Sequence, residues 1–80
     1  MQYKKIFVEV ISKFDLDGNI IPMSILWEDG RKFDIDRILD VRKAASLKAG
    51  GKGNRYTIYI GGKQRYLFDD CGRWFVEGIV

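Results

Sequence analysis

Apolar and polar residues alternate with a period of two along most of this chain, and that pattern predicts half-buried β-strands. In residues 4–14, "KKIFVEVISKF", the alternation puts Val8 and Val10 on one side of a strand and Glu9 on the other. Residues 20–28, "IIPMSILWE", repeat the pattern. Pro22 lacks an amide donor, so this strand should begin there or lie at a sheet edge.

A longer alternating run spans residues 31–43, "RKFDIDRILDVRK". Phe33, Ile35, Leu39 and Val41 fall on one side of it, and mostly charged residues fall on the other. We expect one long, half-buried strand that bends near Arg37.

Tight turns separate these runs. "DLDGN", "EDGR", "GGK" and "CGR" each contain glycine, and Asp-Gly between two apolar runs is a strong signal for a β-hairpin. Short strands at this spacing predict an all-β fold, and closure into a barrel hides exposed strand edges. We therefore expect residues 1–80 to form a single domain, a small SH3-like barrel of five to six antiparallel strands.

Residues 43–49 fit two structures. Alanine, leucine and lysine favour a short helical turn, and Gly50-Gly51 could end one, yet a helix of this length is marginal without packing. The alternative is a strand that runs on into a glycine loop, which we favour. The predicted core consists of Trp27, Phe33, Ile35, Leu39, Val41, Ile58, Ile60 and Trp74.

Composition is consistent with a small folded domain. Apolar residues make up 46% of the chain and aromatic residues 14%, enough for one core and unlike a disordered sequence. Cys71 is the single cysteine, so no intramolecular disulfide can form and a reducing compartment fits best. The sequence has neither the apolar region of a signal peptide nor the ~20 apolar residues of a membrane span. We expect a cytoplasmic protein without a membrane partner.

Charge is distributed unevenly. The net charge is +3, but residues 41–68 carry seven Lys or Arg side chains and no Asp or Glu. Residues 1–40 carry six basic and eight acidic side chains, and residues 69–80 carry one basic and three acidic. A basic middle segment therefore lies between two acidic ones.

Enzyme chemistry has few candidate groups. The chain has no histidine, and Cys71 follows two aspartates that would oppose thiolate formation. Asp34 and Asp36 share one side of a predicted strand, about 7 Å apart, but that side is also where solvated carboxylates are ordinary. "DLDGN" lacks the glutamate of a calcium loop, and neither "GGKGN" nor "GGKQ" completes a phosphate-binding loop. We expect no catalytic residue, no metal, no cofactor and no small-molecule substrate.

The basic segment is the strongest functional signal. Lysine and arginine neutralise phosphates, and aromatic rings stack on bases, so this composition predicts contact with nucleic acid at low sequence specificity. Two alternatives remain open. A protein partner could bind, either an acidic one on the same face or one that adds a strand at an exposed sheet edge, or the surface could be purely structural. The candidate binding residues are Arg42, Lys43, Lys48, Lys52, Arg55, Tyr59, Lys63 and Arg65.

Three segments carry a family resemblance: "WEDGR" at 27–31, "AASLKAGG" at 44–51 and "RWFVE" at 73–77. Across residues 21–77 the chain resembles a family of short uncharacterised bacterial proteins, mainly from Firmicutes. The resemblance implies a small β-barrel without an established activity. It also implies a module that is accessory to a larger enzyme such as a DNA polymerase.

Overall fold

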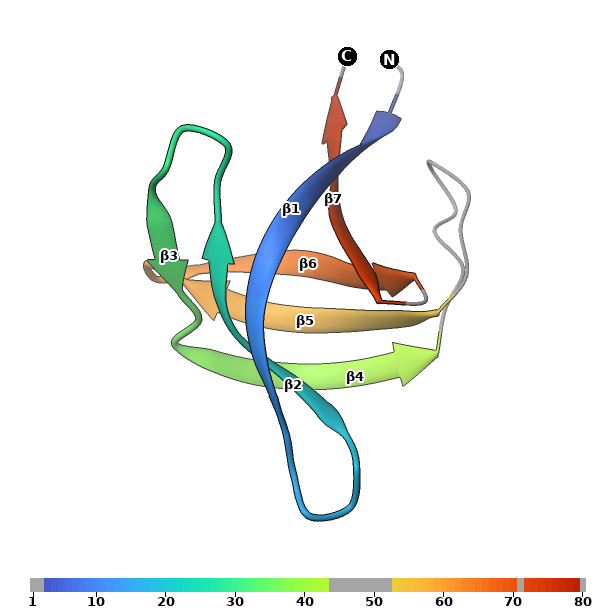
Figure 1. Ribbon diagram of the computed structural model, residues 1–80. Helices are drawn as coiled ribbons and strands as arrows, with labels where there is room; N and C mark the ends of the chain where they lie inside the picture. The colour runs from blue at the N-terminus through green and yellow to red at the C-terminus, as the bar shows by residue number, and fades with distance from the viewer. Residues whose placement is uncertain (1–2, 44–52, 71, 80) are drawn as a thin grey trace.

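The computed structural model of the protein describes residues 3–43, 53–70 and 72–79. Within these ranges every regular element is a β-strand, and neighbouring strands pair antiparallel (Figure 1). The strands are β1 (Tyr3–Phe14), β2 (Ile20–Leu26), β3 (Lys32–Asp34), β4 (Arg37–Lys43), β5 (Asn54–Ile60), β6 (Lys63–Asp70) and β7 (Arg73–Ile79). No helix among the described residues is both long and apolar enough to cross a bilayer.

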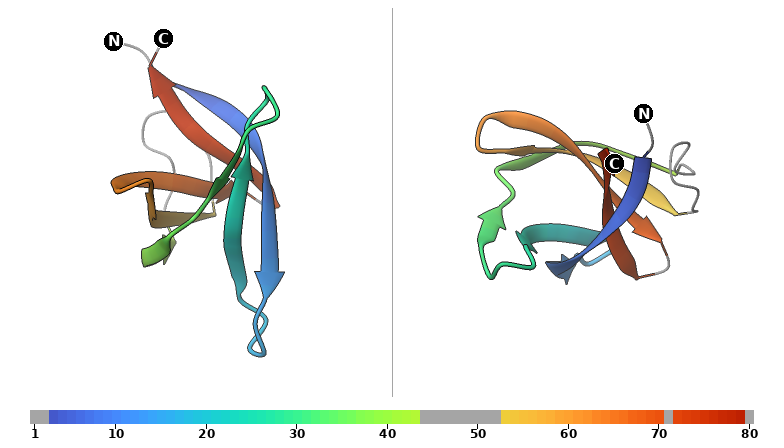
Figure 2. Two further views of the ribbon diagram at one scale, coloured as in Figure 1. Left: turned by 90° about the vertical axis from the view of Figure 1, so that its left-hand side faces the viewer. Right: turned by 90° about the horizontal axis from the view of Figure 1, so that it is seen from above.

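The seven strands form one curled sheet in the order β3-β2-β1-β7-β6-β5-β4. Its two edge strands, β3 and β4, are joined by the short link Ile35–Asp36. The Ile35 amide donates to the carbonyl of Met23 in β2 (2.9 Å), and the Asp36 amide donates to the carbonyl of Tyr59 in β5 (2.8 Å). The link thus contacts strands near both ends of the sheet and gives the sheet the shape of a small barrel (Figures 1 and 2).

The predicted all-β class and small-barrel architecture are confirmed, but the described residues form seven strands rather than the five to six expected. The difference arises because the single strand expected over residues 31–43 is two strands. At Ile35–Asp36 the chain leaves β2 and joins β5, so the expected bend near Arg37 is a complete change of pairing partner. Lys43 belongs to β4, and the helical alternative for residues 44–49 lies outside the described residues.

The turn between β1 and β2 is organised by Asp15. Its carboxylate accepts hydrogen bonds from the backbone amides of Asn19 (2.8 Å) and Asp17 (2.9 Å) and from the Asn19 side chain (3.1 Å). These bonds favour the charged carboxylate and hold the pKa of Asp15 below its usual range. The backbone amide of Asn19 has the largest effect. The predicted turn is therefore confirmed, and this hairpin projects from the barrel (Figure 1).

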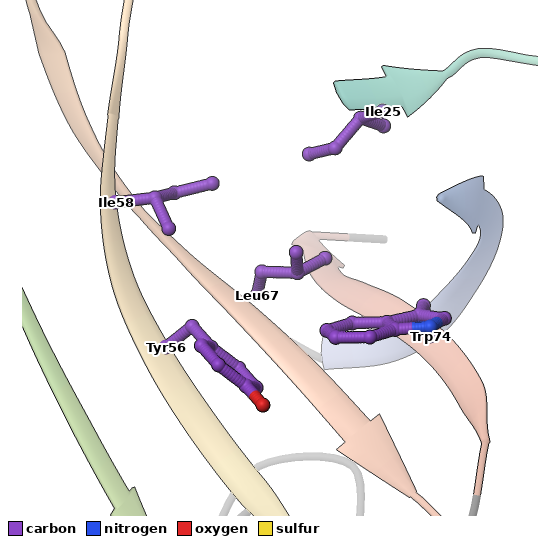
Figure 3. Close-up of a cluster of buried hydrophobic side chains, with 5 residues drawn as sticks. All are labelled: Ile25, Tyr56, Ile58, Leu67 and Trp74. Atoms are coloured by element: carbon purple, nitrogen blue, oxygen red, sulfur yellow. The ribbon is translucent and has the colours of Figure 1, made fainter. Parts of the chain in front are cut away.

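The core lies between the two halves of the curled sheet (Figure 3). Five buried side chains converge there from β2, β5, β6 and β7: Ile25, Tyr56, Ile58, Leu67 and Trp74. The rings of Tyr56 and Trp74 lie 5.4 Å apart. The Tyr56 hydroxyl donates a hydrogen bond to the carbonyl of Ile20 in β2 (2.9 Å), so this buried polar group is satisfied while it ties β5 to β2.

The core prediction is confirmed in part. Ile58 and Trp74 are buried, and Trp27, Ile35 and Ile60 pack against the buried cluster. Phe33 is half-buried, and the Arg31 guanidinium lies over its ring.

Leu39 and Val41 were wrong predictions, because they are 43% and 50% exposed. A bulge between Ile38 and Asp40 shifts the pairing with β5, so Ile38 packs on the core instead of Leu39. Val41 lies opposite Tyr56, but its own strand is at the edge of the sheet, where little covers it.

A second apolar cluster lies on the outer side of the sheet. Phe75 stacks on Phe68 with ring centroids 5.0 Å apart, and its ring meets Phe7 edge-on at 5.7 Å. The Lys5 ammonium lies 5.0 Å from the Phe75 centroid, and the Arg73 guanidinium lies 4.2 Å from that of Phe7. Cations therefore cover rings that the barrel does not enclose.

Gly53 sets the position of β5 against β6. Its φ is +123°, and a Cβ at this position would lie 1.8 Å from the carbonyl oxygen of Asp69. Only glycine permits this approach of the two backbones.

Candidate nucleic-acid interface

The β5–β6 hairpin has two chemically different sides, and its register shows which residue lies on which. Tyr56 pairs with Leu67 and Ile58 with Arg65, which places these residues on the core-facing side. The other side of the hairpin carries Arg55, Thr57 and Tyr59 from β5 and Gln64, Tyr66 and Phe68 from β6.

Strand β4 adds two arginines to this outer side. Arg37 pairs with Tyr59, and Arg42 pairs with Arg55. We define the outer basic face as Arg37, Arg42, Arg55, Tyr59 and Tyr66. Its position follows from strand register, because β4, β5 and β6 are neighbours in the sheet.

Arginines lie against tyrosine rings on this face. The Arg37 guanidinium carbon is 5.2 Å from the centroid of Tyr59, and that of Arg55 is 4.8 Å from the centroid of Tyr66. Tyr66 remains 47% exposed although Arg55 lies over its ring. Each pair combines a fixed positive charge with an aromatic surface.

Only part of the charge on this face is neutralised. Arg42 Nε lies 2.6 Å from Asp40 Oδ2 in an exposed ion pair. Arg55 lies directly opposite Arg42, and like charges in that position destabilise a sheet. The Nε atom of Arg55 is buried and has no hydrogen-bond acceptor among the described residues.

The structure divides the eight predicted binding residues. Arg42, Arg55 and Tyr59 lie together on the outer basic face. Lys43, Lys63 and Arg65 are exposed but belong by register to the core-facing side of their strands. Strand register therefore distributes these six residues over two sides of the sheet. Lys48 and Lys52 lie outside the described residues.

Two residues of the face were missed as candidates. Arg37 lies outside the acid-free segment, and only the pairing of β4 with β5 brings it to Tyr59. Tyr66 lies within that segment, and its alternation with Leu67 could have identified it as an outward residue once the side facing the core was known.

The carboxylates considered as catalytic candidates have structural partners. Asp34 accepts a hydrogen bond from buried Ser24 Oγ (2.8 Å) and lies 3.6 Å from Lys32 Nζ. The serine hydrogen bond and then the lysine charge hold the pKa of Asp34 below its usual range. Asp36 Oδ2 accepts a hydrogen bond from the amide of Gly61 (3.0 Å), which anchors the β5–β6 turn.

Comparisons with known proteins do not assign a family or a function to this chain. No family model, no curated protein sequence and no solved structure matches this chain. The resemblance to a bacterial β-barrel family therefore stays a prediction.

Proposed function

We propose that this protein is a non-catalytic, cytoplasmic β-barrel module that binds single-stranded nucleic acid across its outer basic face. The observation that carries the proposal is the placement of arginines over tyrosine rings on adjacent strands. Phosphate-neutralising cations beside exposed rings are the two components of surfaces that bind single strands with little sequence preference.

The opposed arginines supply a reason for an anion to bind. Arg42 and Arg55 face each other across β4 and β5, with one carboxylate, Asp40, beside Arg42. A phosphate oxygen near Arg55 would relieve the repulsion and accept hydrogen bonds from the guanidinium. Arginine is suited to this contact because its planar group offers several donors in a fixed geometry.

The tyrosines supply the contact with bases. Tyr59 and Tyr66 occupy diagonal positions of the hairpin, since Tyr59 pairs with Gln64 and Tyr66 with Thr57. Diagonal side chains are about 7–8 Å apart, within reach of one another for aromatic residues. Unpaired bases present their ring faces to such a surface, whereas bases in a duplex do not, so a single strand is the expected ligand.

The test compares matched charge reversals on the two sides of the sheet. Fluorescence anisotropy of a labelled single-stranded oligonucleotide is measured over a salt series for the parent, Arg37→Glu/Arg42→Glu and Lys63→Glu/Arg65→Glu. Both variants change the charge equally, but only the first alters the outer basic face. We expect the first to abolish detectable binding and the second to weaken it only slightly.

Salt dependence separates this function from binding to an acidic protein. Contact by Arg37, Arg42 and Arg55 predicts a log–log slope of about −2 for a single strand. An equal loss of oligonucleotide affinity in both variants would show that binding depends on total charge and not on the outer basic face, and would overturn the proposal. No binding at low salt would overturn the proposal and favour the protein-interaction alternative, including an accessory role beside a larger enzyme.

A further inference from the structure

Strand β1 changes its pairing partner halfway along its length. Its first half, Tyr3–Val8, pairs with β7, and its second half, Glu9–Phe14, pairs with β2 along the opposite edge. Among the described residues, the edge of Glu9–Phe14 that would continue toward β7 therefore has no neighbouring strand. Unpaired backbone groups along such an edge can accept another strand.

This free edge is open to solvent. A shallow groove of about 650 Å³ lies where β1 and β7 separate, and residues of both strands line it, among them Val8, Val10, Ser12 and Trp74. Ile11 is 46% exposed and Phe14 is 71% exposed. Two large apolar side chains thus project from the same six-residue segment that pairs with β2 along one edge and has no neighbouring strand along the other among the described residues.

The charges along this edge are self-complementary. Val8 and Val10 pack on the core, which places Glu9 and Ile11 on the outer side. Lys13 continues this alternation along β1, beyond a register shift in the pairing with β2 between Ile11 and Ser12. Neither Glu9 nor Lys13 forms an ion pair within the part of the chain that the structure describes. In an antiparallel pair of two such strands centred on Ile11, each Glu9 lies opposite Lys13 of the other copy.

We propose that two copies of this chain associate through the Glu9–Lys13 edge of β1, antiparallel and related by a two-fold axis. The pairing places Ile11 against Ile11 and forms two Glu9–Lys13 cross-strand ion pairs. It also directs Phe14 of each copy toward the groove of the other, which covers an exposed ring.

Neighbouring pairing registers do not place Glu9 opposite Lys13. A shift of one residue places Glu9 opposite Phe14 and Val10 opposite Lys13. Centring on Ser12 places Ile11 opposite Lys13 and leaves Glu9 without a cation. The sequence around Ile11 therefore favours a second copy in one register over an arbitrary extended peptide.

The test uses a charge swap. Sedimentation equilibrium from about 10 µM to about 1 mM is compared for the parent, Glu9→Lys, Lys13→Glu, and the double variant Glu9→Lys/Lys13→Glu. We expect a reversible monomer–dimer equilibrium for the parent. Each single variant should raise the dissociation constant roughly tenfold, since it sets like charges opposite each other twice, and the double variant should restore it.

Lys63→Glu is the matched control, because it reverses an exposed lysine at the β5–β6 turn, in a part of β6 that does not pair with β7, and should leave association unchanged. Circular dichroism of each variant checks that the barrel is folded. A parent that stays monomeric throughout, single variants that dimerise like the parent, or a double variant that associates no better than the single ones would each overturn the proposal. None of these residues belongs to the outer basic face, so the oligonucleotide assay is independent of this result.

Discussion

The two sides of the β5–β6 hairpin share one backbone and differ in almost everything else. On the core-facing side, Tyr56 is 3% exposed and Leu67 is fully buried. On the outer side, Tyr66 is 47% exposed and lies beneath the guanidinium of Arg55. The same residue type thus serves the core on one side and a solvated cationic surface on the other.

The two tyrosines show how context assigns a role. Tyr56 uses its hydroxyl to satisfy the carbonyl of Ile20 inside the barrel. Tyr66 offers the face of its ring to an arginine and to solvent. A side chain with an apolar ring and a polar end suits both positions, so residue type alone does not distinguish them. The comparison teaches that strand register, through the alternation of neighbouring residues, separates buried core side chains from exposed ones in this hairpin.

The largest expected effect comes from the core-facing side. Leu67→Ala removes a fully buried side chain at the centre of the cluster and leaves a cavity. We expect a loss of about 2–5 kcal/mol in the free energy of unfolding, measured by urea denaturation. An eighty-residue domain has little stability in reserve, so the variant should be partly unfolded at 37 °C. If the free energy of unfolding fell by no more than it does for a typical substitution of an exposed residue, Leu67 would not be part of the core.

A smaller effect is expected when the buried tyrosine loses only its hydroxyl. Tyr56→Phe keeps the ring but leaves the Ile20 carbonyl without this donor, and we expect a loss of about 1–2 kcal/mol near pH 7. Burial, and then the charge of Asp69, raise the pKa of Tyr56 above its ordinary value of 10.0. The unfolded chain therefore releases the Tyr56 proton at a lower pH than the folded chain does.

This difference fixes the sign of a pH dependence. The neutral Tyr56 hydroxyl contributes its full stability below pH 10.0, the pKa of the unfolded chain. That contribution is lost as the pH rises above 10.0 and passes the higher pKa of Tyr56 in the folded protein. The parent should therefore keep its advantage over Tyr56→Phe up to about pH 10.0 and lose it progressively as the pH rises further. Urea denaturation of both proteins across that range measures it, and a constant difference would contradict the assigned cause.

The smallest effect on stability is expected on the outer side. Tyr66→Ala removes one exposed ring and its contact with Arg55, so the free energy of unfolding should fall by about 1 kcal/mol or less. Binding of a single-stranded oligonucleotide should weaken by roughly tenfold, because a stacked base is worth about 1–3 kcal/mol. Tyr66→Phe keeps the ring and should bind almost as the parent does. Equal losses in the two variants would assign the effect to the hydroxyl.

Much of the fold could be predicted from local pattern. Alternation located the strands, and Asp-Gly and Gly-Gly pairs located the turns, because both signals depend on a few neighbouring residues. Leu39 and Val41 were misplaced for a non-local reason. The bulge after Ile38 and the edge position of β4 depend on pairing with β5, which alternation within one strand does not report.

The candidate site was predictable to a lesser degree. The acid-free segment pointed to Arg42, Arg55 and Tyr59, and these residues do share a face. Its charge total also included Lys63 and Arg65, which lie on the other side of the hairpin. Counting charges along a chain cannot separate two sides of a sheet, since residues adjacent in sequence point in opposite directions.

By itself, the sequence determined which segments are strands, where they turn, and that the middle of the chain is rich in positive charge. These properties are local, since backbone preferences and side-chain alternation act over a few residues. Tertiary structure alone decided that Arg37 reaches Tyr59 and that Tyr56 lies inside while Tyr66 lies outside. It also decided that half of β1 has no second neighbouring strand among the residues that the structure describes. The physical reason is that these outcomes depend on strand pairing and on the curl of the sheet, which join residues that are distant along the chain.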